Sequence, residues 1–218
     1  MLKPMTDPPA VNALASERAL PALYMLRGAN PIVEAAIPPD CEILPLPSTR
    51  LHQARAVMEL DGPLTDQAWD ELLGGVLPGG LFVLRDRRSN QLIGTASAID
   101  NPAGGRFYFP GGGQLGYLVV DAARRGKGLG YSLVAAVVGR LRVAGHRHLW
   151  LGVQGWRLPA IRTYLRAGYL PFLHGPNPDH LLTRWIRVFA AAGLTADVTI
   201  WPRALPSSDL VNAPAGQQ

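Results

Sequence analysis

The spacing of apolar residues along the chain changes between a two-residue and a 3.6-residue period, which predicts strands alternating with helices. Short apolar runs bounded by glycine, proline or charged residues predict strands. These runs cover residues 41–47, 81–84, 92–99, 114–120, 148–153, 169–173 and 197–201. Apolar residues three or four positions apart predict helices over residues 49–60, 64–80, 130–145, 158–168 and 180–193.

This order of elements predicts an α/β (α+β) fold, with a mixed sheet covered by helices on both faces. Residues 1–40 are rich in proline and alanine, with one helix-length apolar patch near Val11–Leu26, and we expect them to form an N-terminal arm. Residues 41–203 form the expected domain. Residues 204–218 are expected to be a polar tail.

Composition limits the classes of protein to consider. With 218 residues and 48% apolar content, the chain can bury one substantial core. The single cysteine, Cys41, cannot form an internal disulfide, and no Cys and His spacing suggests a metal site. No apolar stretch has the length of a signal peptide or a membrane span, so we expect a cytoplasmic protein with no membrane partner.

Positive charge is concentrated in the second half of the chain. Residues 1–100 carry 8 basic and 12 acidic groups, whereas residues 101–218 carry 13 and 4. A nucleic-acid binder and an enzyme for a phosphate-rich small molecule both fit this asymmetry. The scarcity of lysine beyond Lys3 and Lys127, and the lack of a recognition-helix signature, argue against nucleic acid.

A glycine-rich stretch, VVDAARRGKGLGYSLV over residues 119–134, links a predicted strand to a predicted helix. Tyr131 stands where a dinucleotide fingerprint needs its third glycine, and Lys127 lacks the following Ser or Thr of a P-loop. Backbone N–H groups at a helix N-terminus nevertheless bind anions well, and Arg124, Arg125 and Lys127 add positive charge. The stretch predicts a pyrophosphate site, with a tight turn and solvated arginines as the alternative.

Two motifs resemble those of the GCN5-related N-acetyltransferase (GNAT) superfamily. RGKGLG, Arg125 to Gly130, has the form Arg/Gln-x-x-Gly-x-Gly/Ala, and PAIRTYLRAGY, Pro159 to Tyr169, is similar to the later Ala-Ile, Tyr and Gly-Tyr motif. The resemblance implies a mostly antiparallel sheet whose strands splay at the acetyl-CoA site. It also implies direct transfer of an acetyl group to an amine, without a metal.

The same resemblance implies roles for individual residues. Tyr164 matches the tyrosine that protonates the departing thiolate, which suits a phenol with a pKa near 10. The implied acetyl-CoA-binding residues comprise a strand segment and the glycine loop: Leu118, Val119, Val120, Arg125, Gly126, Lys127, Gly128, Leu129, Gly130 and Tyr131. The backbone N–H of Val119 or Val120 is expected to stabilise the oxyanion.

The sequence departs from the family pattern at two places. Arg157 stands where the family usually has Asn, and it either reaches the cofactor or is solvated. The strand at residues 114–120 has no carboxylate to act as a general base, only Gln114 and Tyr117. Asp100, His174 and His180 are candidate bases by chemistry alone.

The acceptor is expected to be a small-molecule or peptide amine, and acidic residues of the first half would attract a cationic one. They are Glu59, Asp61, Asp66, Asp70 and Glu71, and a solvated helix face explains these charges equally well. Six large apolar residues could line an apolar pocket, but the spacing of each favours core or rim packing: Met58, Trp69, Phe107, Tyr108, Phe109 and Trp185. A homodimer is compatible with the sequence, and a non-catalytic CoA-binding regulatory domain is the alternative function.

Overall fold

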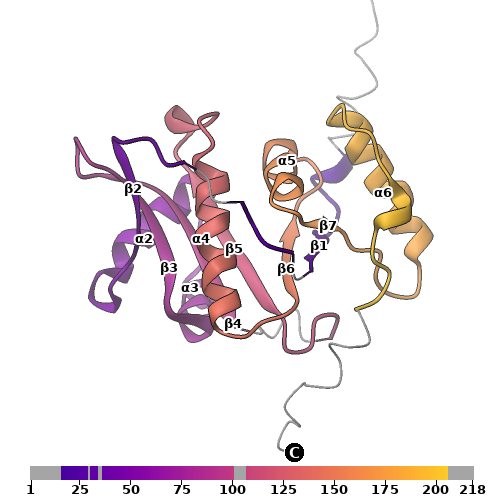
Figure 1. The fold of residues 1–218 in the computed structure, drawn as a ribbon, viewed down its shortest axis with the longest axis horizontal. Coiled ribbons are helices and arrows are strands. Elements are labelled where there is room, and N and C mark those ends of the chain that lie inside the picture. Colours follow the sequence, from indigo (N-terminus) through magenta and orange to yellow (C-terminus); the bar gives the residue numbers. More distant parts are fainter. Residues whose placement is uncertain (1–15, 29, 34–35, 101–106, 206–218) are drawn as a thin grey trace, which may run out of the picture.

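One sheet organises the molecule, as the computed structural model shows for residues 16–28, 30–33, 36–100 and 107–205 (Figure 1). Its seven strands are β1 (Leu23–Arg27), β2 (Cys41–Pro45), β3 (Val76–Asp86), β4 (Leu92–Asp100), β5 (Gly113–Val120), β6 (Leu149–Val153) and β7 (Leu170–Pro171). They lie in the order β2-β3-β4-β5-β6-β1-β7. All neighbours pair antiparallel except β5 and β6, which confirms the expected mixed, mostly antiparallel sheet.

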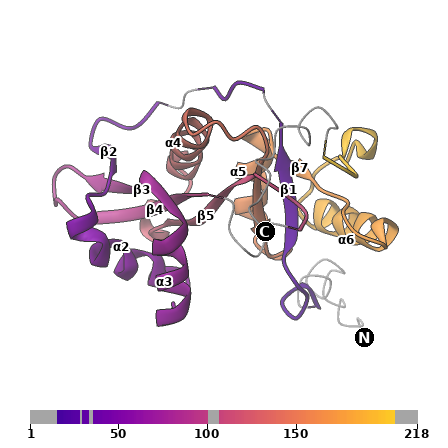
Figure 2. The same cartoon turned by 90° about the horizontal axis from the view of Figure 1, so that it is seen from below.

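Helices cover both faces of this sheet. They are α2 (Leu51–Met58), α3 (Asp66–Gly75), α4 (Leu129–Val143), α5 (Leu158–Arg166) and α6 (Pro178–Ala191). Seen along the sheet, α2 and α3 lie on one face and α4 on the other (Figure 2). Helix α6 lies beyond β1 and β7 at the far end (Figure 1).

The core follows from the apolar faces of these helices. Leu133, Val137 and Leu141 repeat at helical spacing along α4 and are fully buried against the sheet. On the opposite face, Trp69 and Leu72 of α3 pack into a second apolar cluster. Helix α4 ends where predicted, because Gly145 after it takes a positive φ of +91°. The Thr65 side chain caps the start of α3 by accepting from the Ala68 N–H. The expected helix over residues 64–80 is too long, since α3 ends at Gly75 and residues 76–80 belong to β3.

Strand β1 lies inside the segment expected to be an arm. It pairs with β6 along its whole length and with β7 on its other edge, and Leu23 and Met25 are fully buried. Its last residue, Arg27, is also buried, and its guanidinium donates to the backbone oxygens of Ala167, Gly28 and Asn30. The sheet therefore includes residues before Cys41.

Two further local expectations were wrong. The patch near Val11–Leu26, of which residues 11–15 lie outside the described residues, contains most of strand β1 rather than a continuous helix. Residues 197–201 form a 3₁₀ turn, η5 (Val198–Ile200), instead of a strand. The Asp197 side chain accepts from the N–H and hydroxyl of Thr199, and such a local bond competes with strand formation. Most of the expected polar tail, residues 206–218, also lies outside the described residues.

Candidate active site

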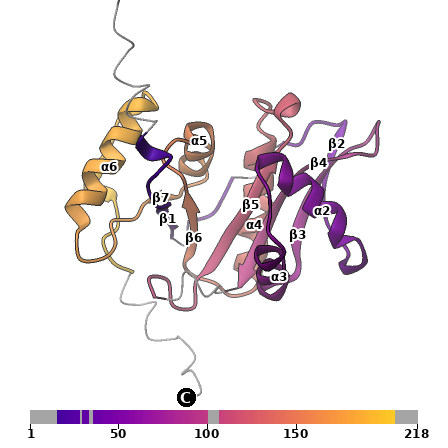
Figure 3. The same ribbon diagram turned by 180° about the vertical axis from the view of Figure 1, so that it is seen from behind.

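The sheet splits between β5 and β6. These two strands pair at only two positions, Gly113 with Leu149 and Gln114 with Trp150, and then diverge (Figure 3). Strand β5 continues to Val120 and stays paired with β4 on its other side. The β6-facing edge of β5 beyond Gln114 is therefore free to hydrogen-bond with an extended ligand.

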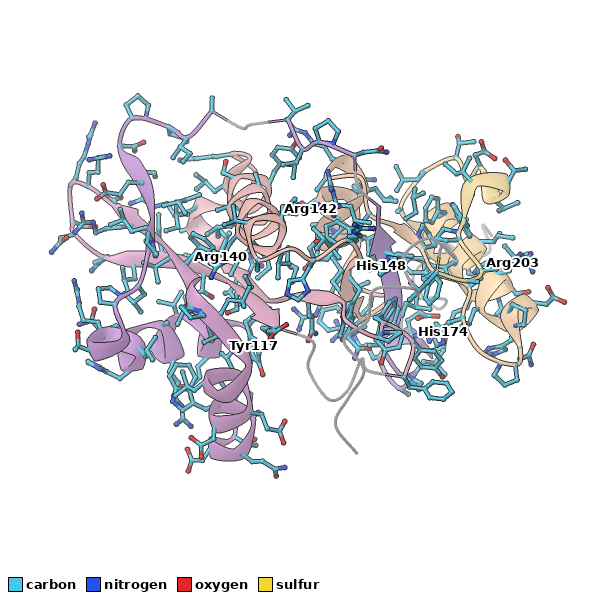
Figure 4. All side chains as sticks on the ribbon, turned by 60° about the horizontal axis from the view of Figure 1, so that its bottom comes forward. Tyr117, Arg140, Arg142, His148, His174 and Arg203 are labelled. Carbon is cyan, nitrogen blue, oxygen red and sulfur yellow. The ribbon has the colours of Figure 1, made fainter. Side chains whose placement is uncertain are left out.

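A bulge bends β5 beside the split. The register with β4 shifts between Thr95 and Ser97, and Tyr117 takes a left-handed φ of +51°. The Thr95 hydroxyl donates to the Tyr117 carbonyl at 2.9 Å, which satisfies a backbone group that the bulge frees. The Tyr117 side chain lies on the side of α3 (Figure 4), and its hydroxyl donates to the Ala68 carbonyl at 3.4 Å.

The glycine loop follows β5 and leads into α4. Gly126 and Gly128 have φ values of +80° and +78°, which side chains rarely adopt, so glycine is required at both positions by the backbone itself. A Cβ on Gly130 would meet nothing closer than 3.9 Å, so the protein alone does not demand glycine there. The N-terminus of this 15-residue helix has no acidic residue in its first turn, which fits an approaching anion.

Only one of the three basic side chains near the loop faces the split. Arg125 donates from Nε to the Val120 carbonyl at 2.8 Å and lines the adjoining cavity. Arg124 instead forms an ion pair with the buried Asp86. Lys127 is exposed and does not line the cavity, so its expected place in the cofactor site has no support from the cavity's lining.

A cavity of about 900 Å³ extends from the free edge of β5 over the glycine loop to α5. All the residues implied to bind the cofactor, except Lys127, line it: Leu118, Val119, Val120, Arg125, Gly126, Gly128, Leu129, Gly130 and Tyr131. We call it the larger cavity.

Helix α5 adds cations that the sequence analysis did not single out. Arg162 and Arg166 stand four residues apart and both line the larger cavity. The Arg166 guanidinium lies 4.5 Å from the centre of the Tyr131 ring, and Arg162 donates to the Ala192 carbonyl. Their spacing and the basic balance of the second half were the available signals.

A smaller cavity of about 340 Å³ adjoins the larger one. Five residues line both: Asp61, Leu118, Val119, Arg157 and Ala160. Tyr164 of α5 lines the smaller cavity with a side chain that is only 7% exposed, and its ring packs edge-on against Tyr169. Burial raises the pKa of the Tyr164 phenol, Arg157 opposes that rise and Asp61 adds to it, so the phenol keeps its proton at neutral pH.

Arg157 lies between the two cavities. It forms an ion pair with Asp61, and its guanidinium lies 4.7 Å from the centre of the Trp156 ring. Two further residues that the sequence analysis named, Met58 and Tyr117, line the smaller cavity.

The remaining candidates lie elsewhere. None of the three candidate bases lines either cavity. Asp100 faces His146 at 3.2 Å, and His174 (Figure 4) packs against the ring of Tyr108. His180 is exposed on α6. The other large apolar candidates line neither cavity: Trp69, Phe107, Tyr108, Phe109 and Trp185. Phe107 is 88% exposed.

The described residues show neither a cluster of metal ligands nor a membrane-spanning helix. In this part of the chain, no three or more His, Cys, Asp or Glu side chains are grouped so that they could hold a metal ion. Among the helices that the structure describes, none is long and apolar enough to cross a membrane.

A mostly antiparallel sheet that splits at a parallel pair of strands, with a glycine loop beside the split, is the fold of the GNAT class. Residues 49–169 match the Acetyltransferase (GNAT) family, and the chain belongs to that family. A GCN5-related N-acetyltransferase from Sphaerobacter thermophilus superposes with a TM-score of 0.53 at 21% identity, over 74% of this chain and 53% of that one. One from Kribbella flavida superposes with a TM-score of 0.50 at 18% identity, over 75% and 60%.

Among curated proteins, the chain is 27% identical to the mycothiol acetyltransferase of Mycobacteroides abscessus over 190 residues. That alignment covers 75% of this chain and 58% of the relative. The chain therefore spans little more than half the length of this relative.

Proposed function

We propose that this protein transfers an acetyl group from acetyl-CoA directly to an amine acceptor. The observation that carries the proposal is the split between β5 and β6, because it leaves a free strand edge beside a helix N-terminus. An amide-bearing pantetheine arm can pair with Leu118, Val119 and Val120, while the N–H groups of Gly126 to Tyr131 receive the pyrophosphate. Arg125, Arg162 and Arg166 add positive charge around the same cavity.

The chemistry is assigned to the place where the two cavities meet. The acceptor nitrogen, once neutral, attacks the thioester carbonyl carbon, and the backbone N–H of Val119 or Val120 stabilises the oxyanion. As the new C–N bond forms, the C–S bond breaks and the nitrogen loses its second proton to solvent. Tyr164 gives its proton to the thiolate and regains one through water.

Binding of the donor is the first test. Isothermal titration calorimetry with CoA is expected to show one site, and thiol release from acetyl-CoA is expected to depend on an added amine. No CoA binding at sub-millimolar concentrations would overturn the proposal.

One observation favours a second candidate, a non-catalytic CoA-binding regulatory domain: no carboxylate stands on β5, from Gly113 to Val120. This candidate predicts CoA binding without thiol release over a panel of monoamines, polyamines, amino sugars and lysine peptides. Amine-dependent thiol release excludes it.

The setting of the reaction is also part of the proposal. We place the protein in the cytoplasm, where acetyl-CoA is available, without a metal, a membrane or nucleic acid as partner. Activity that survives treatment with a chelator, and native mass spectrometry that separates a monomer from a homodimer, test these points.

A further inference from the structure

Asp61 is the one carboxylate among the described residues that line either cavity. It lies at the end of η2 (Glu59–Asp61), just after α2, and belongs to the linings of both cavities. All the charged side chains that share these linings with it are arginines: Arg125, Arg157, Arg162 and Arg166. A negative charge at the junction of two otherwise basic or apolar cavities selects for a cation.

The ion pair between Asp61 and Arg157 still allows this carboxylate to bind another cation. The two side chains are 31% and 32% exposed, and exposed ion pairs contribute at most about 1 kcal/mol. Arg157 also has a second support, because its guanidinium stacks on Trp156. An ammonium group can therefore replace Arg157 at Asp61 without leaving the arginine unsupported.

Asp61 and Tyr164, the proposed proton donor, both line the smaller cavity. The negative charge of Asp61 contributes to the raised pKa of the Tyr164 phenol. A group bound to Asp61 is thus held close to the position where the thiolate would leave.

The smaller cavity also contains a buried polar atom that has no hydrogen-bond partner among the described residues. The Oε1 atom of Gln154, at the end of β6, is buried, and no hydrogen bond satisfies it within the part of the chain that the structure describes. A buried acceptor without a donor is costly, so it fits a site that a ligand completes. Carboxylate and amide oxygens together suit a primary ammonium, which has three N–H donors.

The other walls define the rest of the ligand. They include seven apolar side chains: Ala22, Met58, Pro63, Leu64, Leu118, Val153 and Ala160. A cavity of about 340 Å³ with these walls fits a small amine with one cationic group on an apolar body.

We propose that Asp61 is the specificity-determining residue for the acceptor, which it binds as a small primary ammonium with an apolar body. This inference rests on the acetyl transfer proposed above. Once one proton has left the ammonium to solvent, the carboxylate keeps accepting an N–H bond and orients the nitrogen lone pair toward the thioester.

The test compares Asp61→Asn with three other variants at saturating acetyl-CoA. The probes are 2-phenylethylamine, spermidine, glucosamine and a lysine peptide, and we expect the first to be acetylated best. Asp61→Asn is expected to raise the KM for the amine about tenfold or more, as for loss of a hydrogen bond to a charged group. Asp61→Glu is expected to recover part of this loss.

Arg157→Gln separates recognition from a purely structural ion pair. A structural pair predicts equal losses from Asp61→Asn and Arg157→Gln, whereas recognition predicts that removing Arg157 leaves the KM for the amine unchanged or lower. Asp66→Asn is the matched control, because Asp66 also pairs with an arginine, Arg55, but lines neither cavity. CoA calorimetry on every variant confirms that it is folded.

The outcomes are distinct. If the wild type neither binds CoA nor acetylates any probe, the proposed function fails. If it acetylates amines but Asp61→Asn keeps the wild-type KM, or if Asp61→Asn and Arg157→Gln lose equally, this inference alone is overturned. Preference for spermidine, glucosamine or the lysine peptide over 2-phenylethylamine overturns the proposed acceptor class.

Discussion

At the scale of single residues, Tyr164 offers the sharpest distinction between a catalytic and a packing role. We expect Tyr164→Phe to lower kcat about a hundredfold, within the usual range for a general acid, while CoA affinity stays near the wild-type value. The reason is that phenylalanine keeps the ring in its packed position and removes only the transferable proton. Steady-state kinetics with calorimetry measures both quantities.

Tyr169 supplies the control for this substitution. Its ring contacts that of Tyr164, but its hydroxyl is buried, lines neither cavity and has no hydrogen-bond partner among the described residues. Tyr169→Phe should therefore leave kcat unchanged. Equal kcat for Tyr164→Phe and the wild type would remove Tyr164 from the chemistry.

Gly128 tests the glycine loop separately from the chemistry. An alanine at its φ of +78° is strained by about 1–2 kcal/mol, so Gly128→Ala should weaken CoA binding about tenfold and lower the free energy of unfolding. Gly139→Ala lies within α4 in open space and should instead stabilise by about 0.5–1 kcal/mol. Calorimetry and urea unfolding compare the two, and unchanged CoA affinity in Gly128→Ala would contradict a role for this loop in binding.

At the scale of elements, two buried tyrosines make the free energy of unfolding fall at alkaline pH. Tyr164 lies in α5, and Tyr169 lies directly before β7. Burial raises the pKa values of Tyr164 and Tyr169 in the folded state above the value of about 10 for an unfolded chain. Each phenol thus stabilises the fold fully below pH 10, and this contribution is lost as the pH rises through the raised folded-state pKa. We expect the free energy of unfolding by urea to fall above pH 10, and to fall less steeply in Tyr169→Phe. A flat profile to pH 11 would contradict this burial.

The elements also show which features the sequence could reveal. The glycine loop and α5 contain local motifs, so their resemblance to those of the GNAT family predicts Gly128 and Tyr164 beside one split sheet. Strand β1 was missed because five residues ending in Arg27 carry little periodic signal, and only the backbone oxygens of Gly28, Asn30 and Ala167 make that buried arginine tolerable. The sequence could not reveal the pairing of Asp61 with Arg157 either, because 96 residues separate them and the fold brings them together.

At the scale of the whole molecule, the uneven charge of the chain corresponds to two cavities. The basic second half supplies the arginines of the larger cavity, and the acidic first half supplies Asp61 to the junction. The arginines of the larger cavity suit an anionic donor, and the carboxylate of Asp61 suits a cationic acceptor. The two kinds of charge come together beside the split between β5 and β6, where Asp61 of the first half pairs with Arg157 of the second.

A buried ion pair fastens the segment before β1 to α6, far away in sequence. Glu17 and Arg184 are 4% and 6% exposed and 2.8 Å apart, and Arg184 also donates to the Pro21 carbonyl at 2.7 Å. Ala22, which follows directly, lines the smaller cavity. Loosening this pair should therefore disturb the acceptor side of the molecule before the donor side.

Arg184→Met tests this coupling. It leaves Glu17 buried without a partner, which should cost about 3–5 kcal/mol in the free energy of unfolding, and replacing Glu17 by Leu as well should restore part of that loss. We expect amide exchange at Leu23–Arg27 to quicken and the KM for the amine to rise, while CoA affinity changes little. Arg187→Met, exposed on the same helix, is the control. Wild-type stability and amine KM in Arg184→Met would show that the segment before β1 does not depend on this pair to shape the acceptor cavity.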